Sequence, residues 1–207
     1  MVYSLVIGIL VSYLLGNLNG AVCISALMHD DVRSHGSGNA GLTNFIRNYG
    51  AGQALYVILI DAGKAVLSCL VTGLLLQPYD MGLEGAAIGG AAVMLGHICP
   101  ALLGFRGGKG ILSGLFVALV VDWRIGVAIT VIFFIAYLLT QYVSLGSVLG
   151  AAGYAIGFAV LHRDNPVVML CGVVMGALCV FMHRENIARL IKGQERKTQI
   201  FGRGKGK

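Results

Sequence analysis

Long, uninterrupted apolar segments are the feature that most constrains the fold of this chain. A helix of about 20 apolar residues is long enough to cross the hydrocarbon core of a bilayer. Because hydrocarbon cannot satisfy exposed backbone groups, and because the runs lack the alternation of barrel strands, every span is predicted to be a helix. We place seven spans near residues 3–28, 51–76, 84–103, 111–121, 125–143, 146–161 and 166–182. The expected fold is therefore an all-α integral membrane protein.

The composition supports the same class. Hydrophobic residues make up 57% of the chain and charged residues only 12%, whereas soluble domains keep roughly a quarter of their residues charged. The first apolar run has neither a basic leader nor a small-residue cleavage site, so we interpret it as a retained span and not as a signal peptide. We expect a single membrane domain over residues 1–193, followed by a short, basic, mobile tail over 194–207.

The fourth segment, 111–121, is the shortest. At about 1.5 Å per residue it covers only about half of a ~30 Å hydrocarbon core, so it tilts, borrows flanking residues or re-enters. Segments 111–121 and 125–143 form a pair that leaves one side of the membrane after Lys109 and returns to it at Ser144. Segments 146–161 and 166–182 likewise leave that side and return to it at His183. The polar motif-bearing regions are therefore expected on one side.

The distribution of charge predicts which side this is. Short cytoplasmic loops carry an excess of Lys and Arg. The opposite side offers only Arg124 and Arg163, together with Asp80, Asp122 and Asp164. The motif side carries Arg33, Arg47, Arg106, Lys109, Arg184, Arg189, Lys192, Arg196, Lys197, Arg203, Lys205 and Lys207. We expect an outside N-terminus and a cytoplasmic C-terminus. The net charge of +6 then follows from topology and attraction to anionic headgroups, without a nucleic-acid partner.

Two glycine-rich polar segments point to an anion site. Residues 35–44 contain three glycines, two asparagines, a serine and a threonine, and residues 107–110 add Lys109 between glycines. Glycines let backbone N–H groups approach an anion, and lysine adds a point charge. Neither segment fits a nucleotide motif, since the first follows a membrane span and the second lacks the Ser or Thr that holds magnesium. Most other glycines are expected to pack helices.

Other polar residues leave two interpretations open. Asp61 and Lys64 are an i,i+3 pair inside a span, which is either functional or a structural ion pair. His97 precedes a proline-broken helix end, where it is either catalytic or bonded to free carbonyls. Ser144 and Ser147 are either ligand contacts or helix caps at the interface. Further along, His183 and Asn186 share a helix face, a pairing that lipid-phosphate binding alone would not need. That last pairing favours contact with one ligand.

The sequence predicts no metal and no cofactor. Five cysteines are scattered through apolar segments without a C-x-x-C pair, so they are expected to be core residues and not zinc ligands. Carboxylates near the motifs are too few and too separated for a magnesium cage.

Three motifs, taken in order, resemble those of the PlsY acyltransferases. They are Ser37-Gly38-Asn39-x-Gly41-x-Thr43-Asn44, then Gly96-His97-x-x-Pro100 running into Phe105-x-Gly107-Gly108-Lys109-Gly110, and finally His183-x-x-Asn186-Ile187-x-Arg189-Leu190. The resemblance extends over nearly the whole chain, with small departures such as Asn19 where a proline is common. It implies a bacterial inner-membrane enzyme that moves an acyl group from acyl phosphate to the sn-1 hydroxyl of glycerol 3-phosphate, giving lysophosphatidic acid and inorganic phosphate.

The resemblance also implies residue roles at the cytoplasmic face. The implied catalytic residues are Ser37, Arg47, Lys109, His183 and Asn186. The implied substrate-binding residues are Gly38, Asn39, Gly41, Thr43, Asn44, His97, Gly107, Gly108, Gly110 and Ser147. In this scheme the first motif and Lys109 hold phosphoryl groups with help from glycine N–H groups, while His183 and Asn186 position glycerol 3-phosphate. Arg47 and Lys109 would stabilise charge on the leaving phosphate.

By analogy with the family, the acyl phosphate itself accepts the hydroxyl proton, and no covalent acyl-enzyme forms. The chain contains no H-x4-D pattern of the soluble-type glycerolipid acyltransferases. The expected partners are the two substrates and the bilayer, and a complex with the soluble enzyme that makes acyl phosphate is left open. A transporter of phosphorylated solutes is the competing class, although its site should lie near the bilayer midplane. A structural scaffold would leave the phosphate chemistry of the loops unexplained.

Overall fold

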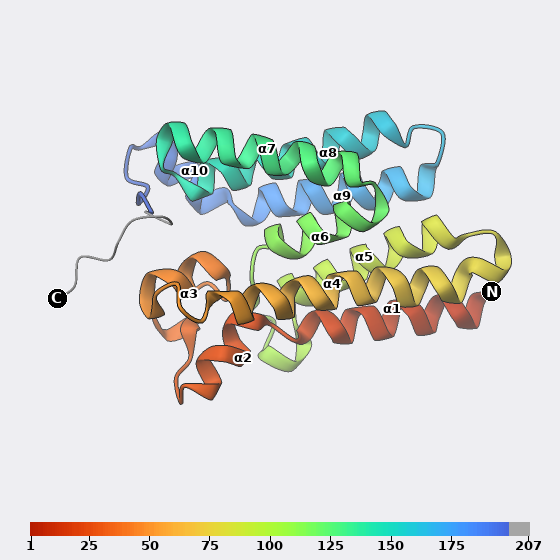
Figure 1. The fold of residues 1–207 in the computed structure, drawn as a ribbon, viewed down its shortest axis with the longest axis horizontal. Helices are drawn as coiled ribbons and strands as arrows, with labels where there is room; N and C mark the ends of the chain where they lie inside the picture. The colour runs from red at the N-terminus through yellow and green to blue at the C-terminus, as the bar shows by residue number, and fades with distance from the viewer. Residues whose placement is uncertain (199–207) are drawn as a thin grey trace.

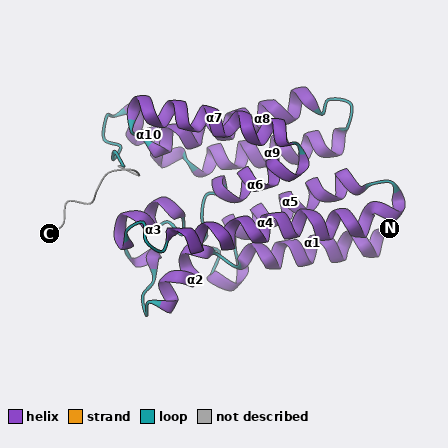
Figure 2. Cartoon of the chain, viewed as in Figure 1, coloured by secondary structure: helices purple, strands orange, loops and turns teal. Residues whose placement is uncertain are grey.

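The computed structural model describes residues 1–198, and over this range the chain is helical with no strand (Figures 1 and 2). The helices are α1 (Val2–Asn17), α2 (Gly20–Leu27), α3 (Leu42–Tyr49), α4 (Ala54–Leu76), α5 (Gly82–Ile98), α6 (Ile111–Val121), α7 (Trp123–Thr140), α8 (Val143–Leu161), α9 (Pro166–Met182) and α10 (Arg184–Ile191). The predicted all-α membrane class is confirmed.

The long helices form two layers with α6 between them (Figure 1). Helices α1, α4 and α5 contact one another in one layer, and α7 packs on α8 and α8 on α9 in the other. Buried apolar side chains such as Met94, Val117 and Phe158 fill the space between the layers. Outward-facing residues such as Leu74 and Leu139 are 70% and 81% exposed. An apolar exterior of this kind suits contact with lipid.

Glycines allow the helices of the first layer to approach closely. A Cβ added to Gly96 would lie 2.1 Å from the carbonyl oxygen of Tyr13, and one added to Gly89 would lie 2.4 Å from that of Ser68. Backbones this close are typical of small-residue contacts between membrane helices. These glycines therefore pack helices, as the sequence predicts.

By length and apolar composition alone, fewer helices qualify as complete spans than the seven expected. Within residues 1–198, four helices are long and apolar enough to cross a membrane, and six spans result if each bent pair, α1 with α2 and α9 with α10, counts as one. Helix α6, with 11 residues, is too short to cross a ~30 Å core by itself. It is held between the two layers instead, because its neighbours α4, α5 and α7 cover it.

Helix boundaries near the motifs also differ from the prediction. The first span is interrupted at Leu18 and Asn19, where the chain bends by 43° and the Asn19 side chain caps α2 by accepting from the Val22 N–H at 3.1 Å. The glycine-rich stretch is only partly a loop, since α3 begins at Leu42 and carries Thr43, Asn44 and Arg47. The third span ends at Ile98, where Pro100 prevents the helix from continuing.

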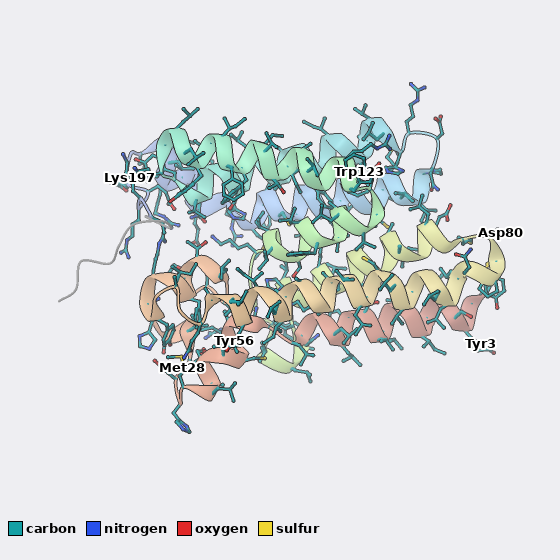
Figure 3. All side chains as sticks on the ribbon, viewed as in Figure 1. Tyr3, Met28, Tyr56, Asp80, Trp123 and Lys197 are labelled. Atoms are coloured by element: carbon teal, nitrogen blue, oxygen red, sulfur yellow. The ribbon has the colours of Figure 1, made fainter. Side chains whose placement is uncertain are left out.

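The polar connections collect at one end of the bundle, here called the motif end, formed by residues 28–53, 99–110, 141–142 and 183–198. Met28 and Lys197 lie at this end, and Tyr3 and Asp80 lie at the other (Figure 3). This agrees with the predicted sidedness, while the assignment of the motif end to the cytoplasm stays a prediction. Among the first tail residues, 194–198, Glu195 and Thr198 are buried, and the mobility of the tail stays a prediction. The rest of the expected tail, 199–207, lies outside the described residues.

Candidate active site

A cavity of about 430 Å³ opens at the motif end and continues between the helices. Its polar part is lined by expected site residues from four separate segments, namely Ser37, Thr43, Arg47, Lys109, Ser147, His183 and Asn186. Its deeper part is apolar, with Ile58, Leu115 and Phe133 among the lining residues. The structure thus brings most of the predicted set to one cavity. A cavity that is charged at one end and apolar at the other fits an amphiphilic ligand.

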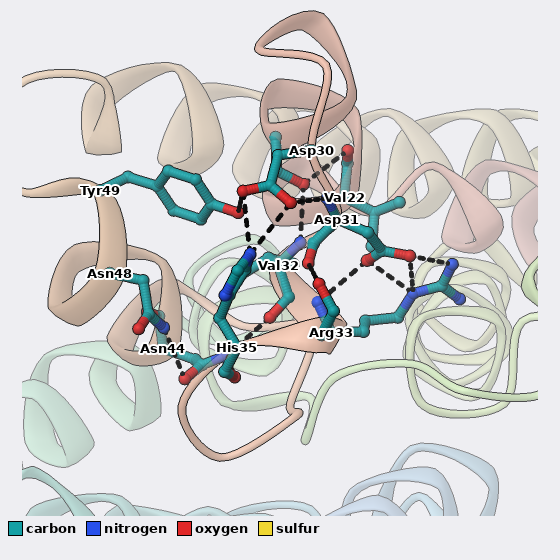
Figure 4. A network of polar contacts seen from close by, with 11 residues as sticks. Val22, Asp30, Asp31, Val32, Arg33, His35, Asn44, Asn48 and Tyr49 are labelled. Atoms are coloured by element: carbon teal, nitrogen blue, oxygen red, sulfur yellow. Dashed lines mark hydrogen bonds and ion pairs between the residues drawn. The ribbon is translucent and has the colours of Figure 1, made fainter.

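A network of polar contacts shapes the first loop (Figure 4). The Asp30 carboxylate accepts hydrogen bonds from the His35 ring at 2.9 Å and from the Tyr49 hydroxyl at 2.9 Å. The hydrogen bond from His35 holds the pKa of the Asp30 carboxyl below its usual value. Arg33 pairs with Asp31 and also donates to the carbonyl oxygen of Leu103 at 3.1 Å. The loop is therefore tied both to α3 and to the second motif-bearing loop.

Asn44 has a structural task within this network. Its amide nitrogen donates to the carbonyl oxygens of Val32 and His35 at 3.0 and 3.1 Å, and its amide oxygen accepts from the Ser37 N–H at 3.0 Å. Both ends of the amide are therefore used to hold the loop that carries Ser37. Asn44 lies at the cavity wall, and it fixes the position of Ser37 there.

Several glycines expected to offer N–H groups to an anion use them within the fold. The N–H of Gly38 donates to His35 at 2.9 Å, that of Gly41 to Asn39 at 3.0 Å, and that of Gly108 to His97 at 3.0 Å.

Gly107 and Gly108 pack tightly on His97, and neither lines the cavity. A Cβ on Gly107 would lie 2.0 Å from the His97 carbonyl oxygen, and a Cβ on Gly108 would lie 2.1 Å from the His97 ring. Gly110, with φ of +83°, precedes α6 and does line the cavity. Close packing thus explains Gly107 and Gly108 in this structure, and their backbone holds Lys109 in place.

Lys109 links the second motif to the third. Its ammonium group hydrogen-bonds the side-chain oxygen of Asn186, and both residues line the cavity. The amide nitrogen of Asn186 donates in turn to the Glu195 carboxylate at 2.9 Å, and Arg189 donates to the same carboxylate at 2.7 Å. Burial, followed by the nearby Arg189 guanidinium, lowers the pKa of Lys109. A phosphate arriving here would relieve this accumulation of positive charge.

His183 directly follows α9 and lines the same cavity. Its Nδ1 donates to the carbonyl oxygen of Cys179 at 2.8 Å, because a carbonyl can only accept. Burial lowers the pKa of His183 to about 4, so the ring is neutral at pH 7. A neutral ring with its proton on Nδ1 has a lone pair on Nε2. His183 therefore presents a hydrogen-bond acceptor.

Asp61, Lys64 and His97 form a buried cluster where α1 breaks. Lys64 Nζ lies 2.8 Å from Asp61 Oδ1 and 2.8 Å from His97 Nδ1, and it also donates to the Leu18 carbonyl at 2.8 Å. Asp61 accepts the N–H of Gly20 at 3.1 Å. This geometry supports the structural interpretation of the pair. His97 was expected either to be catalytic or to bond free carbonyl groups at the helix end. In the structure its Nδ1 contacts the Lys64 ammonium group instead of such a carbonyl.

Arg47, on α3, contacts the end of the described chain. Its guanidinium donates to the Thr198 hydroxyl at 3.0 Å and to the Arg196 carbonyl at 3.2 Å. Arg189, Glu195 and Thr198 line the cavity, although sequence reasoning gave them no role. Glu195 could have been singled out from the sequence because it is the one acidic residue in a basic tail. In the described part of the chain, no group of three or more His, Cys, Asp or Glu side chains is placed to hold a metal ion.

Comparisons with known proteins identify the family of the chain. The family model described as glycerol-3-phosphate acyltransferase matches residues 6–193. The chain is 38% identical over 196 residues to a glycerol-3-phosphate acyltransferase of Finegoldia magna, which covers 94% of this chain and 96% of the relative. It is 36% identical over 189 residues to that of Thermoanaerobacter sp., covering 91% and 92% of the two chains.

Solved structures show the same fold. The crystal structure of PlsY, an integral membrane glycerol 3-phosphate acyltransferase, in its glycerol 3-phosphate form superposes with a TM-score of 0.83 at 30% identity, over 95% of this chain and 96% of that one. Its lysophosphatidic acid form gives a TM-score of 0.80 at 29% identity, with the same coverage. With its membrane fold, its motif-lined cavity and these matches, the chain belongs to the glycerol-3-phosphate acyltransferase family.

Proposed function

We propose that this acyltransferase uses acyl phosphate as donor and acylates the sn-1 hydroxyl of glycerol 3-phosphate, releasing lysophosphatidic acid and inorganic phosphate. The observation that carries the proposal is one cavity whose cationic end and apolar interior are continuous. Both proposed substrates carry phosphate, and the donor also carries an acyl chain. The polar end would hold phosphate while the apolar part receives the chain.

The cations at the polar end suit phosphate recognition. Arg47, Lys109 and Arg189 line the cavity, and guanidinium groups bind phosphate oxygens in pairs. Ser37, Asn39 and Thr43 lie on the same wall and would supply further hydrogen bonds. The lysophosphatidic acid form of a solved relative is consistent with the proposed product.

In the proposed reaction, the hydroxyl oxygen of glycerol 3-phosphate attacks the acyl carbon of the mixed anhydride. The bond from that carbon to the bridging oxygen breaks, and inorganic phosphate leaves with that oxygen and with the proton of the hydroxyl. Arg47 and Lys109 would stabilise the charge that develops on the departing phosphate. The phosphate is a good leaving group, so no acyl-enzyme intermediate is needed.

The state of His183 supports this assignment of the proton. With a pKa of about 4, its Nε2 is a weak base, whereas the donor's phosphate becomes more basic as its bond to the acyl carbon breaks and negative charge collects on it. His183 would therefore accept a hydrogen bond from the substrate hydroxyl and orient it, while the donor's phosphate takes the proton. Asn186, already bonded to Lys109, would position glycerol 3-phosphate beside it.

We place the site at the cytoplasmic face of a bacterial inner membrane. The basis is the excess of Lys and Arg at the motif end compared with the opposite end. A soluble enzyme that makes acyl phosphate would deliver the donor at that face.

Purified protein in lipid tests the donor. With glycerol 3-phosphate present, turnover is expected with acyl phosphate and not with acyl-CoA. Turnover with acyl-CoA alone would assign a different donor class. Uptake of phosphorylated solute by proteoliposomes, without any acylation, would point to transport instead.

The absence of a covalent intermediate is tested separately. Among the described residues, Ser37 makes no hydrogen bond to a histidine that would activate it, and its N–H is held by Asn44. Incubation with radiolabelled acyl phosphate in the absence of glycerol 3-phosphate is expected to leave the denatured protein unlabelled. Label retained by wild type and lost in Ser37→Ala would contradict the direct-transfer mechanism.

A further inference from the structure

A second pocket lies beside the active-site cavity at the motif end. It has a volume of about 370 Å³ and is built from the first loop, α3 and residues 196–198. The two cavities share Ser37, Asn44, Ile46, Arg47 and Thr198 in their walls. The outer pocket therefore adjoins the active-site cavity along one common wall.

The outer pocket has the chemistry of an anion site. Arg47, Arg196 and Lys197 contribute three cations to its lining, and Asn48 adds an amide. None of the described residues that line it carries a carboxylate, whereas the inner cavity contains Asp61 and Glu195. A concave surface lined by one sign of charge raises the local concentration of a ligand of the opposite sign.

The residues of this pocket are also held in position. Lys197 lies over the ring of Tyr142 with its ammonium 5.7 Å from the ring centroid. Asn48 is fixed by hydrogen bonds to Asn44, and Arg47 is fixed by those to residues 196 and 198. Thr198 is anchored further by its N–H, which donates to the Gln141 carbonyl at 3.1 Å.

Arg47 is a cation that lines both the outer pocket and the inner cavity. Its guanidinium, bonded to the Thr198 hydroxyl, stands between the outer pocket and the inner cavity, and it lines both. A phosphate that binds in the outer pocket would meet Arg47 there. Because Arg47 lines both cavities, the same guanidinium would also contact the phosphate once it reaches the inner cavity, where Lys109 lies.

We propose that the outer pocket is a loading site for the water-soluble phosphate monoester, which binds to Arg196, Lys197 and the outer side of Arg47 before it enters the inner cavity. The amphiphilic donor reaches the inner cavity from the bilayer and does not use this pocket. The inference rests on the proposed function, because it takes glycerol 3-phosphate as the ligand that loads.

The test removes the two exposed cations that belong only to the outer pocket, in Arg196→Gln/Lys197→Gln. At low ionic strength, kcat/KM for glycerol 3-phosphate is expected to fall about fivefold or more, with kcat unchanged and kcat/KM for the acyl donor unchanged. The difference from wild type should shrink as salt rises to about 1 M, where the Debye length is near 3 Å.

The matched control is Arg106→Gln/Lys192→Gln. Arg106 and Lys192 are exposed at the same end but line neither cavity, and their replacement removes the same amount of charge. A loss no larger than in this control, or an equal loss in kcat/KM for the donor, would overturn the loading site. Either result would mean that the charges attract phosphate to the membrane surface in general.

The association rate of radiolabelled glycerol 3-phosphate, measured by rapid mixing without donor, separates this inference from the proposed function. Slower association in Arg196→Gln/Lys197→Gln than in the control supports the loading site even if no acyl phosphate is turned over. Unchanged association contradicts it even if the enzyme is active as proposed.

Discussion

Replacement of Lys109 by methionine is expected to lower kcat/KM by about 10²–10³-fold. Lys109 lies in the cavity beside Asn186, where its charge would stabilise the departing phosphate. Methionine keeps a similar apolar stem and removes only the ammonium group, so the loop that carries it should pack as before. Steady-state rates of phosphate release from acyl phosphate measure the effect.

Lys192→Met is the control for this change. Lys192 is exposed just after α10 at the same end of the molecule and does not line the cavity, so its replacement should cost less than twofold. Thermal unfolding of both variants establishes that the fold is retained. A folded Lys109→Met enzyme with activity within about threefold of wild type would remove Lys109 from the chemistry.

Asp61→Asn is expected to reduce the free energy of unfolding by about 3–5 kcal/mol, because it leaves Lys64 charged and unpaired in the interior. The side chains of Asp61 and Lys64 are each 2% exposed, and their charged atoms lie 2.8 Å apart. Asp61 also accepts a hydrogen bond from the N–H of Gly20 at the start of α2. The bend between α1 and α2, which leads into the first loop, should therefore become less rigid as well. Unfolding by heat in detergent or lipid measures the loss.

The double variant Asp61→Asn/Lys64→Met tests the cause. Because it removes both charges, it should recover most of the lost stability. If Asp61→Asn keeps the unfolding temperature of wild type but loses turnover, the pair acts in function and the structural interpretation is contradicted.

The overall class and the gathering of the motifs were predictable from sequence for a physical reason. Apolar runs near the bilayer thickness specify spans, and because successive apolar runs point in opposite directions, every second connection shares a side. The segments that carry Ser37, Lys109 and His183 therefore had to meet at one end. The i,i+3 contact of Asp61 and Lys64 was also predictable, since helix geometry alone determines it.

Features that depend on long-range contacts were not predictable in this way. Helix α3 starts inside a glycine-rich stretch, and Asn44 in its first turn donates to the carbonyl oxygens of Val32 and His35, contacts that no local pattern encodes. The close packing of Gly108 on His97 likewise depends on how α5 ends. The basic composition of the tail favours a solvated segment, so it gives no sign that Glu195 would accept hydrogen bonds from Asn186 and Arg189.

The stoichiometry of one reaction tests whether the protein transfers the acyl group directly from acyl phosphate to glycerol 3-phosphate. Purified protein in lipid is given acyl phosphate and glycerol 3-phosphate, and lysophosphatidic acid and inorganic phosphate are counted together over time. Direct acyl transfer predicts that they appear in a 1:1 ratio, with the acyl group on the sn-1 oxygen and no phosphate release when glycerol 3-phosphate is left out. Phosphate released without lysophosphatidic acid, or lysophosphatidic acid formed only from another donor, would contradict it.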